Sequence, residues 1–86
     1  MGNVLQRALG QRIRELRLKQ GYSQEAFADH CGVHRTFMGT VERGESNLSF
    51  QNLARIARSL EITLSELLSG IEKRAAKLEQ YKTPPR

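Results

Sequence analysis

Residues Gln24 to Arg43, QEAFADHCGVHRTFMGTVER, are the most informative stretch of this 86-residue chain. They predict two short helices joined by a tight turn at Gly32, because glycine enters a left-handed conformation without steric cost. Ala28 is small at the point where the two helices must approach each other closely. Apolar side chains are spaced to point into the angle between the helices, at Phe27, Val33, Met38 and Val41.

The second of these helices has a polar, basic face opposite its apolar one. The residues that share this polar face are Arg35, Thr36, Gly39, Thr40 and Arg43. Arg35, Thr36 and Thr40 are the predicted base readers, because Arg–guanine and Thr–methyl contacts suit the DNA major groove. The stretch therefore predicts a helix-turn-helix motif that binds double-stranded DNA. A merely solvated face is the alternative interpretation.

Residues at either end of the motif are predicted to hold the DNA backbone. Gln24 opens the first helix of the pair, where its side chain and the helix N-terminus can both meet a phosphate. Arg43, Asn47 and Ser49 follow the second helix and are expected to anchor the backbone just beyond it.

Composition favours a polyanionic partner and excludes several other classes. The chain has 14 Lys/Arg against 9 Asp/Glu, a net charge of +5. Its single cysteine excludes an internal disulfide and fits a reducing, cytoplasmic compartment. His30, Cys31 and His34 lack a fourth metal ligand, so no metal or other cofactor is expected. No membrane span and no catalytic constellation is apparent, so we expect neither a membrane protein nor an enzyme.

The whole chain is expected to form five helices and no strands. The first spans about residues 4–19, and the second and third are the helices of the motif. Ser49 caps the fourth helix, and Thr63 with Glu66 forms a capping box that begins the fifth. The fourth helix is expected to bury Phe50, Leu53, Ile56, Ala57 and Leu60.

These residues resemble the Xre/Cro-type helix-turn-helix regulators, including the restriction–modification controller proteins. The resemblance runs over residues 8–69, through Leu9-Gly10-Gln11, Ser23-Gln24-Glu25-Ala26-Phe27-Ala28 and Val41-Glu42-Arg43-Gly44-Glu45 to Leu67-Leu68. It implies a compact five-helix, lambda-repressor-like bundle, a phosphate contact for Gln24, and a largely buried ion pair between Arg17 and Glu42. Gly39 departs from the family, whose members usually carry a polar side chain at that position.

The C-terminal region divides the chain into a DNA-binding domain, residues 1–69, and an extension, residues 70–86. An apolar stripe at helical spacing continues from the fifth helix into the extension. We expect one extended helix whose stripe forms a dimer seam, at Leu67, Ile71, Ala75 and Leu78. Alternatively, Gly70 breaks the helix and leaves a basic tail over the phosphates, with Lys73, Arg74, Lys77 and Lys82.

The favoured hypothesis is a sequence-specific DNA-binding transcriptional regulator, a repressor, that acts as a homodimer on an inverted-repeat operator. One alternative is the antitoxin of a toxin–antitoxin pair, in which the C-terminal region would also hold a toxin. A protein-binding adaptor on the same scaffold is the alternative from a different class.

Overall fold

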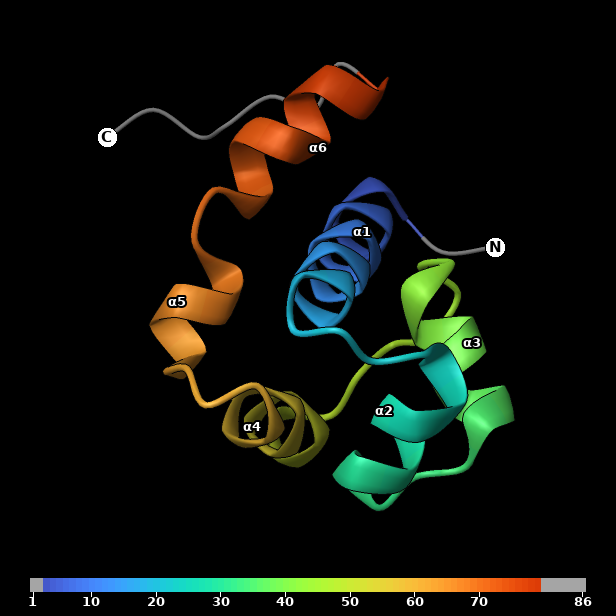
Figure 1. Cartoon of the computed structure of the whole chain (residues 1–86). Coiled ribbons are helices and arrows are strands. Elements are labelled where there is room, and N and C mark those ends of the chain that lie inside the picture. The colour runs from blue at the N-terminus through green and yellow to red at the C-terminus, as the bar shows by residue number, and fades with distance from the viewer. Residues whose placement is uncertain (1–2, 80–86) are drawn as a thin grey trace.

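The computed structural model describes residues 3–79, which form six α-helices and no strand. Figure 1 shows α1 at the centre of the bundle, with the helix-turn-helix pair α2 and α3 on one side. The helices are α1 (Val4–Lys19), α2 (Gln24–Cys31), α3 (Arg35–Glu42), α4 (Phe50–Ser59), α5 (Leu64–Leu68) and α6 (Ile71–Glu79). The predicted all-α class is therefore confirmed. None of the described helices is long and apolar enough to cross a membrane.

Polar side chains begin the helices where the sequence predicts them. The hydroxyl of Ser23 accepts a hydrogen bond from the α2 backbone, and that of Ser49 does the same for α4. Thr63 and Glu66 form the predicted capping box of α5. Gly32 ends α2 in the left-handed conformation, at φ 74°. These caps fix where α2, α4 and α5 begin, and Gly32 fixes where α2 ends.

The main core lies where α1, α2, α3, α4 and α5 meet. Phe27, Ile13 and Met38 are fully buried in it, and Ala28 packs in the same core with only 1% of its surface exposed. Phe50 departs from the expectation, because its side chain is 72% exposed. It is the first residue of α4, and the fully buried positions come only further along, at Ile56 and Ala57 of that helix and at Leu60, its C-cap.

The C-terminal extension is a separate helix and does not continue α5. Ser69 leaves the helical conformation, and Gly70 reverses the chain at φ 75°, a backbone conformation that side chains other than glycine rarely adopt. Figure 1 shows α6 lying beside α1. Ile71 and Ala75 are buried there in a small second core with Ala8.

This packing corrects the reasoning that led to the predicted dimer seam. Leu67 is fully buried in the main core, while Ile71, Ala75 and the half-buried Leu78 pack against α1. The apolar stripe does need a partner, but the N-terminal half of α1 in the same chain supplies it.

The basic-tail alternative is also changed, because three of its four residues belong to α6. Arg74 makes two hydrogen bonds of 2.7 Å to the Glu15 carboxylate on α1. This contact holds the pKa of Glu15 below its ordinary value. Lys73 and Lys77 are exposed on the same helix, and Lys82 lies outside the described residues.

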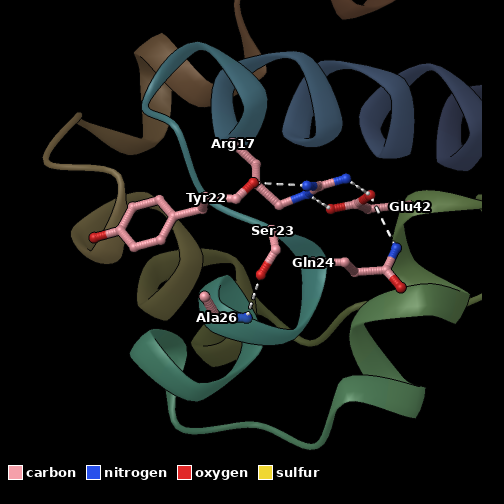
Figure 2. A network of polar contacts seen from close by, with 6 residues as sticks. All are labelled: Arg17, Tyr22, Ser23, Gln24, Ala26 and Glu42. Carbon is pink, nitrogen blue, oxygen red and sulfur yellow. Dashed lines mark hydrogen bonds and ion pairs between the residues drawn. The ribbon is translucent and has the colours of Figure 1, made fainter.

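A buried ion pair joins α1 to the end of α3. The Arg17 guanidinium donates two hydrogen bonds, of 2.6 and 2.9 Å, to the Glu42 carboxylate. It also donates to the Tyr22 carbonyl at 2.8 Å, and the Gln24 amide donates to Glu42 at 3.1 Å (Figure 2). Both charged residues are less than a tenth exposed. The pair therefore ties three helices to one point.

Gly10 lets α1 approach the same end of α3 closely. A Cβ built on Gly10 would lie 2.5 Å from the Val41 carbonyl oxygen and 2.6 Å from that of Glu42. Both atoms belong to backbone, which cannot move aside as a side chain can. Any side chain at this position would separate α1 from α3.

We expect Gly10→Ala to lower the free energy of unfolding by about 1–3 kcal/mol or more, because the added methyl overpacks a backbone contact. Gly39→Ala is the matched control, since its Cβ would meet only the flexible end of Arg43 at 3.1 Å and the Gln24 side chain at 3.5 Å. That variant should gain up to about 0.5–1 kcal/mol from the better helix former. Urea unfolding measures both, and an unaltered Gly10→Ala protein would contradict the close approach.

We expect Glu42→Gln to lower the free energy of unfolding by about 3–5 kcal/mol, because it leaves the buried Arg17 charge without its partner. Adding Arg17→Met should recover much of this loss, since no charge then remains to be desolvated. Thermal melting of the wild type, the single variant and the double variant provides the comparison. Equal melting of wild type and Glu42→Gln would show that the pair contributes nothing.

Candidate nucleic-acid interface

The turn between α2 and α3 fixes where α3 begins. The Val33 N–H donates to the Ala28 carbonyl at 3.0 Å, which closes the turn around Gly32. His34 then caps α3, because its Nδ1 accepts a hydrogen bond from the Thr36 N–H at 3.0 Å. The sequence gives no clear signal for this cap, since Ser, Thr, Asp and Asn are the usual residues at such a position.

The three residues considered as possible metal ligands, His30, Cys31 and His34, each have a separate structural role. His30 stacks on the Tyr22 ring, with 5.2 Å between the ring centroids. Cys31 is buried in the main core, and desolvation raises the pKa of its thiol. His34 is the cap of α3.

The exposed side of α3 begins with Arg35 and Thr36, the first two residues of the helix. Arg35 Nη1 lies 2.7 Å from Glu25 Oε2, and both side chains are about two-thirds exposed, at 67% and 71%. The opposite side of α3 is buried through Met38 and Val41. The helix therefore presents a cationic and hydroxyl-bearing N-terminal turn to the outside while its apolar side holds it on the bundle.

Thr40 is half-buried and uses its hydroxyl internally. Its Oγ1 lies 2.7 Å from the Phe37 carbonyl oxygen and 2.6 Å from Ser46 Oγ. A hydroxyl has one donor hydrogen, so Thr40 donates to Phe37 and accepts from Ser46. These bonds connect α3 to the loop that follows it.

Gly39 is buried beneath two of the other predicted DNA-contacting residues. The nearest atoms to a Cβ at this position would belong to Arg43 and Gln24. A DNA contact in this region would therefore come through those two side chains. The small residue makes room for them above α3.

Gln24 sits at the N-terminus of α2 and is half-buried. One hydrogen of its side-chain amide is used in the bond to Glu42, and the amide carries a second. The first backbone N–H groups of a helix have no partner within that helix. The position thus combines donors that can hold an anion with a rigid attachment to the buried ion pair.

The loop between α3 and α4 carries the remaining predicted residues, all of them exposed. Arg43 lies 3.1 Å from Glu45 in a surface ion pair. Asn47 follows on the same loop, and the Ser49 hydroxyl accepts from the Asn52 N–H at 3.1 Å as the cap of α4. The two acidic partners, Glu25 and Glu45, were missed because the sequence does not show which surface carboxylate an arginine reaches.

Comparisons with known proteins identify the family. A family model described as helix-turn-helix matches residues 13–67. The control protein C.MunI from a Mycoplasma species is 42% identical over 72 residues, which cover 83% of this chain and 97% of that protein. The fold is similar to the restriction–modification controller protein C.AhdI from Aeromonas hydrophila, with a TM-score of 0.68 and 44% identity over 71% of this chain and 92% of that one.

A further solved structure relates the fold to DNA. The master regulator of biofilm formation SinR, solved in complex with DNA, matches with a TM-score of 0.66 and 32% identity, over 71% of this chain and 98% of that one. The family is made up of DNA-binding transcriptional regulators, which are not enzymes. This chain belongs to the helix-turn-helix family of DNA-binding transcriptional regulators, together with the restriction–modification control proteins.

Proposed function

We propose that this protein binds an inverted-repeat operator as a homodimer and represses transcription by occupying it. The observation that supports this most directly is the division of α3 into a buried side and an exposed N-terminal turn with Arg35 and Thr36. A helix held in this way can enter the major groove with its first residues against the base edges. We infer that it acts in the cytoplasm, where its proposed DNA target would be available.

Each exposed residue has a proposed role that follows from its chemistry. Arg35 makes a bidentate contact with the O6 and N7 atoms of a guanine, and Thr36 contacts a neighbouring base. Gln24 binds a phosphate at the N-terminus of α2. Arg43, Asn47 and Ser49 hold the DNA backbone along the loop after α3. Thr40 contributes chiefly by fixing that loop through Ser46.

A surface that shares only Ile71 with the predicted seam is suited to hold the two copies together. A groove of about 330 Å³ lies between the start of α1, the α3–α4 loop, α4 and the α5–α6 region. Its apolar lining consists of Leu5, Leu9, Leu48, Leu53, Leu68 and Ile71. Phe50 stands one turn before Leu53 on the same side of α4 and is 72% exposed. Leu68 is also exposed, at 42%.

The proposed occupant of this groove is a second copy of the chain. None of the residues that line the groove is ionisable, so two chains of net charge +5 can meet there without opposing like charges. A two-fold contact also places the same patch on both partners. The exposed Phe50 of one copy then faces the apolar groove of the other. The groove includes Ser46 and Asn47, so this contact lies beside the proposed DNA-binding loop.

We expect Arg35→Ala to weaken binding to the preferred duplex by about 1–3 kcal/mol and to relax the preference at one base position. Gln24→Ala should weaken binding to all sequences more evenly, because phosphate contacts carry no base information. Selection of duplexes from a random pool followed by fluorescence anisotropy at fixed salt measures both effects. Unchanged affinity and preference in Arg35→Ala would exclude the proposed role of this residue.

We expect Phe50→Asp to give a folded monomer that binds a half-site weakly, since a buried unpaired carboxylate would oppose re-formation of the contact. Leu18→Asp is the matched control: Leu18 is 53% exposed near the far end of α1, roughly 20 Å from Leu5 along the helix. That variant should remain dimeric. Light scattering and gel shifts on full and half operators test this.

A Phe50→Asp protein that stays dimeric would move the contact to another surface. A wild-type protein that is monomeric and co-purifies with a second small protein would instead support the antitoxin alternative. If the wild-type protein shows no measurable affinity for any duplex, at low as well as high salt, that result would support the adaptor alternative.

A further inference from the structure

We propose that Glu25 is a specificity-determining residue, whose carboxylate orients Arg35 for base readout and weakens binding to DNA that lacks the matching base. This inference rests on the proposed function, in which Arg35 reads a base. Glu25 itself is not proposed to read any base. Its role is to control what the neighbouring arginine can do.

The pair bridges the N-terminal turns of the two motif helices. Glu25 is the second residue of α2 and Arg35 is the first residue of α3. Their side chains meet at 2.7 Å between Oε2 and Nη1. Both face a shallow depression over the turn, which is also lined by Asp29, Val33 and His34.

The exposure of this pair decides which effect matters. Ion pairs between exposed side chains contribute little to folding stability, because water and salt screen them. Holding the long arginine side chain in one orientation before DNA arrives is a separate effect, because it reduces the conformational entropy lost on binding. A guanidinium carries five N–H donors, so the contact with Glu25 leaves donors for the two acceptors of a guanine.

The carboxylate also acts against DNA of the wrong sequence. DNA phosphates are negatively charged, so a carboxylate beside the groove-facing end of α3 is repelled by every duplex. On a matching duplex, the bidentate contact of Arg35 with guanine offsets this repulsion. On other duplexes no base contact offsets it, and Glu25 keeps the arginine neutralised and away from the phosphates. The difference in affinity between matching and other DNA is thereby enlarged.

The test compares Glu25→Gln with Asp29→Asn in the full-length protein. Both substitutions remove one negative charge from exposed positions on α2, one helical turn apart. Dissociation constants are measured at one salt concentration for two duplexes, of which the first is the preferred one. The second duplex carries a changed base pair at the position where Arg35→Ala loses its preference.

We expect Asp29→Asn to bind DNA of any sequence somewhat more tightly, and Glu25→Gln to bind chiefly the changed duplex more tightly. Glu25→Gln should also lose at least about fivefold of the discrimination between the two duplexes, within the range that one bidentate base contact provides. Asp29→Asn should keep the discrimination of the wild type. In the Arg35→Ala background, Glu25→Gln should leave discrimination unchanged, because the carboxylate acts through the arginine. Melting curves confirm that all variants are folded.

The outcomes separate this inference from the proposed function. A wild type that selects a duplex, with discrimination that survives Glu25→Gln, would overturn the role of Glu25 alone. Equal losses in Glu25→Gln and Asp29→Asn would also overturn it, because the effect would then be general charge. A wild type with no preferred duplex would overturn the proposed function, and this inference with it.

Discussion

The structure depends on the close attachment of the C-terminal end of α3 to α1. Gly10 allows the two backbones to meet, and the buried Arg17–Glu42 pair holds them there. Arg17 also binds the Tyr22 carbonyl, and Glu42 also accepts from Gln24, so the start of α2 is fixed at the same point. One polar cluster inside a small apolar core therefore sets the positions of both motif helices, α2 and α3, against α1.

This attachment allows a very short helix to act as a rigid recognition element. With eight residues α3 is only about 12 Å long and would not be stable by itself in water. Its buried side and its fixed C-terminal end supply the stability, so the exposed side chains of its N-terminal turn are not needed to hold the helix on the bundle. Arg35 and Thr36 lie in that turn. One turn further on, the Thr40 hydroxyl is hydrogen-bonded to the loop, and Gly39 lies beneath the side chains of Arg43 and Gln24. The part of α3 whose side chains are available for the proposed DNA contact is thus smaller than the whole polar face of the helix.

Local patterns in the sequence predicted the motif and most helix ends, because caps, the Gly32 turn and apolar spacing are short-range signals. They could not predict which surface would cover an apolar stripe. Ile71 and Ala75 are spaced as well for a partner chain as for α1, and only the reversal at Gly70 decides between them. Phe50 was misplaced for a related reason: spacing shows which side of a helix is apolar, but not where along the helix the core ends. Hydrogen bonds between distant surface groups, such as Glu25 with Arg35, carry no sequence signal at all.

In the proposed complex, the N-terminal turn of α3 meets DNA, with the start of α2 and the α3–α4 loop beside it. Backbone amide chemical shifts, followed by NMR while the preferred duplex is added, report which residues lie at this contact. The largest changes are expected on residues 24–25, 35–36 and 43–49, with small changes on α6. Changes concentrated on α6, around the exposed Lys73 and Lys77, with α3 unaffected, would contradict it.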